Sequence, residues 1–267
     1  MHSFAPSALL ALSWRYRKVL VAVTRVELEK RYSGSLLGML WLVLHPVLLL
    51  AIYLFVYSVI FRMQLPQYQG LDYALFVFCG LIPFIGLSEA LSAGTMCIKQ
   101  NMHLVKNVML PIELVPVRSV MASLATQIVG LAFLLALLAA TGHLSWKALL
   151  LPILVVLQAL MLVGIVLVLA SLAVALTDVG YFVNLMLMLL MFVSPIGYTR
   201  DMVPAPFTIL VDLNPVTYMA EAYRQVLLVG QPLSPIPLAA FVLVALACYA
   251  GGAAFFGRFK SVLADYE

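Results

Sequence analysis

Long runs of apolar residues dominate this chain, and they predict membrane-spanning helices. A helix rises about 1.5 Å per residue and the hydrocarbon core of a bilayer is about 30 Å thick, so one span needs roughly 20 largely apolar residues. Six runs reach this length, at residues 36–61, 73–98, 114–141, 148–176, 179–199 and 236–257. Backbone polar groups in lipid must be paired within their own segment. We therefore predict an all-α integral membrane protein with six transmembrane helices in a single domain, residues 1–267.

The residues before the first run are amphipathic. Between residues 14 and 31, charged side chains recur on one side of a helix, at Arg15, Lys18, Arg25 and Glu29. Apolar side chains recur on the other side, at Tyr16, Leu20, Val23 and Val26, and Trp14 stands at the head. Such a helix is expected to lie in the membrane interface. Both a plain surface anchor and a helix with a further role fit this pattern.

A polar segment before the sixth run contains one more predicted helix. Asn214 and Pro215 are typical of an N-cap and a first helical position, and the pattern ends at about Leu228. Glu221 can pair with Arg224 one turn later. Because a helix of roughly 14 residues is too short to span, it must lie on the outer surface or enter the membrane and return.

Composition and the placement of charge support a membrane protein. Apolar residues make up 65% of the chain and charged residues 10%, with a mean hydropathy of +1.11, whereas a soluble domain carries about 25% charged residues. Basic residues are concentrated, eleven against four, in the segments that share a side with the termini. The positive-inside rule then predicts that both termini are cytoplasmic. No basic cluster is interleaved with aromatic residues, so no nucleic-acid partner is expected.

The motifs of common enzymes are missing from the sequence. It has no phosphate-binding loop, no zinc-protease motif, no serine-hydrolase motif and no carboxylate pair at a catalytic spacing. Cys79, Cys97 and Cys248 fall in or beside apolar runs and are interpreted as small apolar residues. The four histidines are far apart in sequence. We predict no catalytic residue and no metal site in this chain.

Glu89 is the only acidic residue deep in a predicted span. An intramembrane carboxylate is costly and is therefore a candidate functional residue. It would be either the proton site of a secondary transporter or a hydrogen-bond partner between helices. The absence of a second deep Asp, Lys or His makes a proton relay the weaker alternative.

Aromatic residues form a second group of candidates. Tyr53, Tyr57 and Phe61 fall on one stripe of the first run, and Phe192 and Tyr198 lie toward the outer end of the fifth. Aromatic rings can stack on sugar faces, so these side chains would suit a pore for glycans. The alternative is an interfacial aromatic belt or ordinary helix packing.

Four stretches, taken in order, resemble a known family. They are RYSGSLLGMLWLVLHP at 31–46, FCGLIPFIGLSEAL at 78–91, HLVKNVMLPIELVPV at 103–117, and SPIGY at 194–198 followed by NPVTYMAEAYRQVLL at 214–228. Together they resemble the permease subunits of type-2 ATP-binding-cassette exporters. The most similar branch exports O-antigen, capsule and teichoic acid polymers.

This resemblance implies a half-transporter in a bacterial cytoplasmic (inner) membrane. A second copy of the chain would complete the channel, and two separate ATPase subunits would bind ATP and Mg²⁺, with no cofactor in this chain. The substrate would be a lipid-linked polysaccharide. A related exporter of small amphiphiles or drugs is the alternative. A proton-coupled transporter using Glu89 and a membrane scaffold are further hypotheses.

The resemblance also assigns roles to particular residues. Residues 14–31 would be the interface helix, with Trp14, Arg15, Lys18 and Arg25. Residues 101–109 would be a cytoplasmic coupling helix, and the candidates for ATPase coupling are Lys99, Asn101, His103, Leu104 and Lys106. Residues 200–235 would form the outer gate, with Asn214, Pro215, Tyr218, Glu221, Tyr223 and Arg224. The Lys106-Asn107 pair stands where many relatives have two basic residues.

Overall fold

The fold is a bundle of helices, described here by a computed structural model over residues 6–32, 34–60, 70–101 and 111–265. The α-helices are α1 (Pro6–Arg15), α2 (Arg17–Tyr32), α3 (Trp41–Leu54), α4 (Leu71–Thr95), α5 (Cys97–Gln100), α7 (Leu114–Ala140), α8 (Leu151–Ala175), α9 (Val179–Val193), α10 (Thr208–Asp212), α11 (Pro215–Leu227) and α12 (Pro235–Asp265). Short 3-10 or π segments are η1 (Gly38–Leu40), η2 (Phe55–Ile60), η3 (Trp146–Leu150), η4 (Arg200–Met202) and η5 (Ala205–Phe207). The predicted all-α class is confirmed for these ranges.

Within the described residues, four helices are long and apolar enough to cross a membrane: α4, α7, α8 with the preceding η3, and α12. They correspond to the second, third, fourth and sixth predicted spans. The second predicted span is interrupted at Met96, so its last residues form the separate helix α5. The sixth is longer than predicted, because α12 continues to Asp265.

The first and fifth predicted spans correspond to shorter apolar helices, at Val43–Ile52 and Val179–Val193. The count of six spans therefore stays a prediction. The helix within the fifth predicted span ends before residue 199. Helix α9 ends at Val193, and Ser194 has extended dihedral angles of φ −76° and ψ 138°. Residue 195 is proline, and its ring disfavours a helical conformation for the residue before it.

The predicted single helix at residues 14–31 is two helices in the structure. Helix α1 ends at Arg15 and α2 begins at Arg17. The apolar residues of α1 have a packing partner, because Leu9 is buried and the Tyr249 hydroxyl of α12 donates to the Pro6 carbonyl over 2.8 Å. Sequence periodicity did not reveal this contact with the opposite end of the chain.

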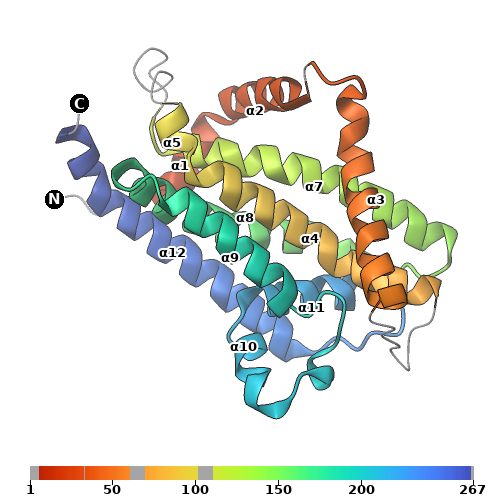
Figure 1. Cartoon of the computed structure of the whole chain (residues 1–267). Helices are drawn as coiled ribbons and strands as arrows, with labels where there is room; N and C mark the ends of the chain where they lie inside the picture. The colour runs from red at the N-terminus through yellow and green to blue at the C-terminus, as the bar shows by residue number, and fades with distance from the viewer. Residues whose placement is uncertain (1–5, 33, 61–69, 102–110, 266–267) are drawn as a thin grey trace.

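Helix α4 is the most buried of the four long helices and packs against α7, α8, α9 and α11 (Figure 1). Helices α8 and α12 approach each other especially closely. A Cβ atom added at Gly164 would lie 2.1 Å from the Cys248 carbonyl oxygen, and one added at Gly252 would lie 2.1 Å from the Gly164 oxygen. Small residues permit this kind of backbone contact between membrane helices.

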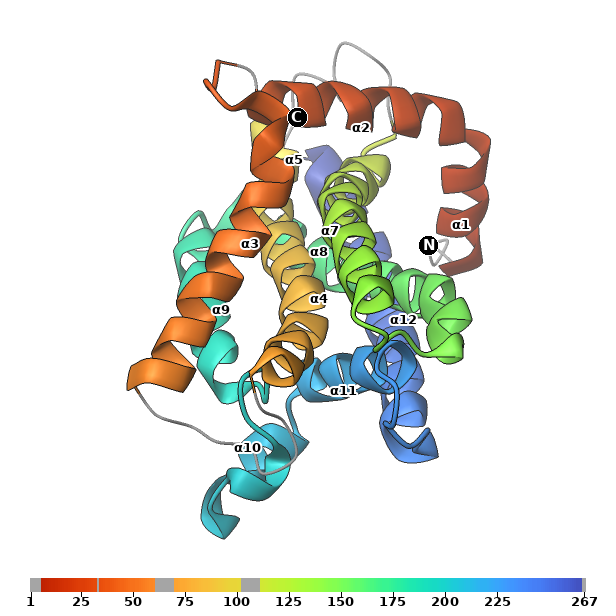
Figure 2. The same cartoon turned by 90° about the vertical axis from the view of Figure 1, so that its right-hand side faces the viewer.

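Helices α2 and α11 cross opposite ends of the bundle (Figure 2). At the α2 end, Arg118 of α7 lies 3.0 Å from the Glu27 carboxylate, and Lys260 of α12 pairs with Glu113. These ion pairs connect α2, α7 and α12.

At the α11 end, a Schellman motif closes α7. Gly142 has φ +75°, and the His143 amide donates to the Leu138 carbonyl over 2.9 Å. The following residues form an isolated antiparallel bridge between Leu144 and Leu228. This bridge holds the chain after α11 against the turn that joins α7 to α8.

Candidate functional site

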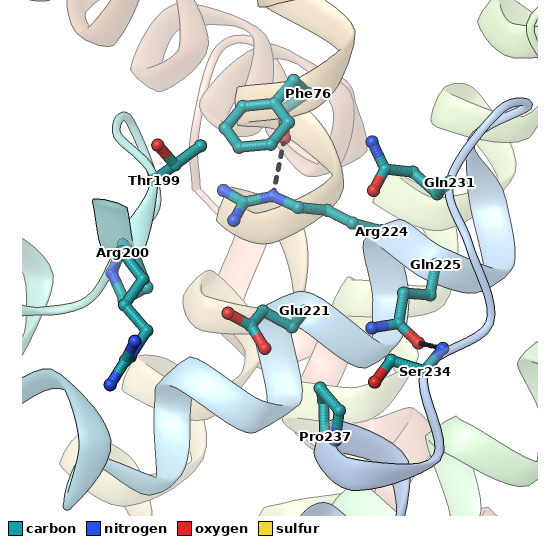
Figure 3. A pocket seen from close by; sticks show the side chains of 10 residues that line it. Phe76, Thr199, Arg200, Glu221, Arg224, Gln225, Gln231, Ser234 and Pro237 are labelled. Atoms are coloured by element: carbon teal, nitrogen blue, oxygen red, sulfur yellow. Dashed lines mark hydrogen bonds between the residues drawn. The ribbon is translucent and has the colours of Figure 1, made fainter. Parts of the chain in front are cut away.

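A pocket of about 320 Å³ lies at the α11 end of the bundle, and we call it the end pocket. Its walls come from the first turns of α4, the segment after α9, the polar side of α11 and the residues that lead into α12 (Figure 3). The lining residues are Phe76, Pro195, Thr199, Arg200, Glu221, Arg224, Gln225, Gln231, Ser234 and Pro237. The pocket thus joins segments that are far apart in sequence.

Arg224 is buried beside this pocket and makes several polar and aromatic contacts. It is only 5% exposed, and its guanidinium carbon lies 3.7 Å from the centre of the Phe76 ring. Its Nε donates to the Phe76 carbonyl over 3.2 Å and its Nη2 donates to the Ile196 carbonyl over 2.6 Å. The cation–π contact and the two hydrogen bonds hold α11 against α4 and the segment after α9.

The end pocket contains charges of both signs. Arg200 forms a two-point ion pair with Asp212, with nitrogen–oxygen distances of 2.5 and 2.7 Å, and this pairing lowers the pKa of the Asp212 carboxyl. Glu221 points into the pocket beside Arg224 (Figure 3). Burial raises the pKa of the Glu221 carboxyl, although the positive charges of Arg224 and Arg200 act in the opposite direction. Glu221 and Arg224 both line the pocket, and the predicted pairing between them stays a prediction.

The start of α11 is as the sequence predicts. The Asn214 side chain accepts a hydrogen bond from the Val216 amide over 2.9 Å, and Pro215 occupies the first turn. The same Asn214 side chain donates to the Ser194 hydroxyl, and the Tyr218 hydroxyl donates to the Asp212 carbonyl. These contacts orient α11 relative to the end of α9.

Tyr223 turns away from the end pocket and joins a buried polar cluster. Its hydroxyl donates to the Gln158 Oε1 over 2.6 Å, while Gln127 and Gln158 exchange two amide hydrogen bonds of 2.8 and 2.9 Å. Gln158 also donates to the Pro83 carbonyl over 2.9 Å. This cluster links α4, α7, α8 and α11. The two glutamines were missed in the sequence, although an amide inside an otherwise apolar run was the available signal.

A second polar group lies on the outside of this single chain. The Ser92 hydroxyl of α4 donates to Asn184 Oδ1 of α9 over 2.9 Å, and both residues are exposed. Glu89 is half-buried one turn before Ser92. We call Glu89, Ser92 and Asn184 the polar face. Polar groups of spanning helices normally avoid lipid and face protein or water.

The structure describes the side chains of only two of the five aromatic candidates. Phe192 is exposed on α9, and the Tyr198 hydroxyl donates to the carbonyls of Phe192 and Val193 at the end of that helix. Tyr198 therefore closes the last turn of α9. The side chains of Tyr53 and Tyr57, and the whole of Phe61, lie outside the described residues.

Two of the five coupling candidates are described. Lys99 of α5 donates to the Thr177 hydroxyl over 2.6 Å and so reaches the turn between α8 and α9. The Asn101 side chain donates to the Cys97 carbonyl over 2.8 Å and closes α5. The predicted coupling helix at 101–109 lies outside the described residues except for Asn101. The same is true of His103, Leu104 and Lys106.

The interface candidates divide between two helices. Trp14 and Arg15 end α1, whereas Lys18 and Arg25 lie on α2, and all four are exposed. On α2, Leu20 is buried, whereas Val26 is 48% exposed. The helix is therefore amphipathic, with its buried side rotated away from Val26.

The end pocket combines hydrogen-bond donors, acceptors and an aromatic ring, which suits reversible contact with a polar solute. Among the described residues, no three His, Cys, Asp or Glu side chains are grouped so that they could hold a metal ion. The architecture is that of a membrane bundle with a polar face and a polar pocket at one end.

Comparison with known proteins gives consistent results. A family model described as "ABC-2 type transporter" matches residues 18–228, which run from α2 to the residue after α11. The chain is 27% identical over 216 residues to the O-antigen export system permease protein RfbA of Myxococcus xanthus, covering 80% of this chain and 81% of that protein. Two proteins of the same name from Klebsiella pneumoniae are 28% and 29% identical, each covering 79% of this chain and 81% of its own length.

Proposed function

This chain belongs to the ABC-2 type transporter family, and from that premise we propose that it is the permease half of an ATP-driven exporter of lipid-linked polysaccharide. The observation that carries the proposal is the similarity to three O-antigen export permeases over about four-fifths of the chain. A polymer of the O-antigen, capsule or teichoic type, crossing a bacterial cytoplasmic membrane, is the proposed substrate.

We propose that two copies of the chain form the channel. The polar face is exposed in the single chain, and Asn184 stands among large exposed side chains of α9 such as Tyr181, Leu185 and Met188. An exposed amide in a lipid-facing position would lose its hydrogen bonds to water. A second copy that covers α9 and encloses a wet channel beside the polar face would remove this cost.

Energy would come from two ATPase subunits that carry ATP and Mg²⁺, since this chain has no phosphate-binding loop. We place their docking surface at the α2 end of the bundle, which also holds α5 with Lys99 and Asn101. The excess of basic residues in segments on this side supports a cytoplasmic orientation for both termini. Movement of α5 would reach α8 and α9 through the hydrogen bond from Lys99 to Thr177.

The α11 end would then face outward, with the end pocket beside the exit. Arg224 and Asn214 connect α11 to α4 and to the segment after α9, so a shift of these helices would be transmitted to the pocket. We propose that this region acts as the outer gate, and that Glu221 and Gln225 contact the passing polymer.

Deletion of the gene in its source organism tests the proposal. Surface glycan should disappear while lipid-linked polymer accumulates inside the cell, and a plasmid copy should reverse both changes. Unchanged surface glycan, in a strain without a second exporter, would contradict polysaccharide export and favour efflux of small amphiphiles.

A further inference from the structure

A second and larger cleft, of about 600 Å³, lies on the side of the bundle beneath α2. Its floor is formed by α7 and α8, including Met121, Leu124 and Val156. Its roof is formed by α2, including Val21 and Leu28. The lining is mainly aliphatic, and the volume lies within the range of about 300–1,000 Å³ that is usual for small-molecule sites.

The helices around the cleft indicate where it lies relative to the membrane. Helices α7 and α8 are long and apolar enough to cross the membrane, and α8 carries no charged residue. Helix α2 is amphipathic and crosses the end of α7 (Figure 2). The cleft therefore opens where acyl chains meet the membrane surface, and an aliphatic cleft of this kind favours hydrocarbon over water.

The polar rim favours an anionic headgroup. Arg25 lines the cleft and its side chain is 81% exposed, with Glu29 paired to it over 2.9 Å. Lys18 is exposed on the same side of α2, seven residues before Arg25. Arg25 and Glu29, which line the cleft, balance each other in charge, and Lys18 adds one positive charge two turns earlier on the same side of α2.

Thr24 provides an independent indication of a ligand. It is 7% exposed and lines the cleft, and its hydroxyl has no hydrogen-bond partner in the part of the chain that the structure describes. A buried hydroxyl without a partner is unfavourable. A carbonyl oxygen of an acyl ester, located just below a phosphate, would accept this hydrogen bond.

We propose that the cleft is a binding site for an anionic phospholipid. One acyl chain lies between α2 and the pair α7–α8, an ester carbonyl accepts from Thr24, and the phosphate lies beside Arg25 and Lys18. The site stabilises the position of α2 on the bundle. It is separate from the end pocket and from the polar face, so it does not depend on which substrate is exported.

Native mass spectrometry of the purified full-length protein tests the site, with phosphatidylglycerol and phosphatidylcholine added back after delipidation. The wild type should retain one phosphatidylglycerol at least about fivefold more strongly than phosphatidylcholine. Ala125→Phe places a ring in the cleft and should weaken that binding about tenfold. Ala136→Phe is the matched control, because Ala136 is exposed on the same helix but does not line the cleft.

Two milder variants test the proposal if Ala125→Phe fails to fold. The first changes the exposed Arg25, and the second replaces Thr24 with a residue of nearly the same shape. Arg25→Gln should bring phosphatidylglycerol retention close to that of phosphatidylcholine. Thr24→Val should weaken the retention of both lipids severalfold. Equal retention of the two lipids by the wild type, or equal loss in Ala136→Phe and Ala125→Phe, would overturn the proposal. Co-purification of a glycolipid that Ala125→Phe removes would overturn it as well.

Discussion

Single polar residues inside apolar runs have defined partners in this protein. Gln127, Gln158 and Tyr223 are all at most 3% exposed and satisfy one another, with the Pro83 carbonyl as a further acceptor. A Cβ atom added at Gly86 would lie 1.9 Å from Gln127 Oε1, so glycine is needed there to admit the amide. The cluster fixes the relative positions of four helices.

Replacing Gln158 with Leu should therefore destabilise the bundle. The change removes the acceptor of the Tyr223 hydroxyl and both bonds to Gln127. We expect a loss of about 1–2 kcal/mol in the free energy of unfolding, measured in detergent with increasing denaturant. Tyr223→Phe should cost less in the Gln158→Leu background than in the wild type, because their shared bond is already absent. Strict additivity of the two changes would contradict a coupled cluster.

Glu221 leads to a prediction about pH. Burial raises the pKa of its carboxyl above the ordinary 4.5, so the folded state favours the protonated form and folding becomes less favourable as pH rises through this range. At pH 7.5 the apparent melting temperature of the Glu221→Gln variant should then exceed that of the wild type, by up to about 4 °C. The difference should disappear below pH 4.5, where Glu221 itself is protonated. A variant that is less stable than the wild type at pH 7.5 would indicate that the attraction to Arg224 outweighs burial.

Among whole elements, α8 and α12 make a close backbone-to-backbone contact. Gly252→Ala would place a methyl group 2.1 Å from the Gly164 oxygen, and the helices would have to separate. We expect a loss of about 1–3 kcal/mol, read from the same denaturant titration. Gly251→Ala is the neighbouring control, since a Cβ atom there meets nothing within 4 Å. That change should leave stability unaltered or raise it by up to about 1 kcal/mol, and an equal effect of the two variants would contradict the close contact.

Several elements could be predicted from sequence because their signals are local. The apolar runs that became α7 and α8 have nearly the predicted ends, and the Asn214-Pro215 start of α11 is confirmed by its capping hydrogen bond. The break at Tyr16 could not be predicted, because no Gly or Pro marks it, and α1 packs against α12 at the other end of the chain. Pro195 could have indicated the end of α9, but the predicted span continued to residue 199.

The candidate site was predicted less completely than the fold. Glu221 and Arg224 were singled out from the sequence, yet the pocket also needs Phe76 and Gln231, which come from other segments. Glu89 was identified as an unusual acid, but its neighbours on the polar face were not. The hydrogen bond between Ser92 and Asn184 joins residues 92 positions apart. Contacts at such separations depend on how the spans pack, and no local pattern encodes them.

For the molecule as a whole, the central question is what covers α9. Val183 and Leu187 are its buried residues, while Tyr181, Phe182 and Met188 are exposed. If lipid covered the entire exposed surface, Asn184 would face hydrocarbon with only Ser92 as a partner on the described residues. A paired copy that leaves a water-filled space beside the polar face accounts for both the apolar and the polar residues of this surface.

Cysteine accessibility distinguishes these two arrangements. With Cys248 replaced by Ala, a water-soluble maleimide should label Asn184→Cys in membranes, because a thiol reacts as the thiolate and needs contact with water. Leu243→Cys is the control, since Leu243 is 68% exposed on α12 and should face lipid and stay unlabelled. The remaining Cys79 and Cys97 are buried. If labelling at Asn184→Cys falls while polymer is being exported, the polymer lies beside the polar face. If Asn184→Cys and Leu243→Cys are equally unreactive, α9 is covered by lipid or by a dry interface, and the channel lies elsewhere.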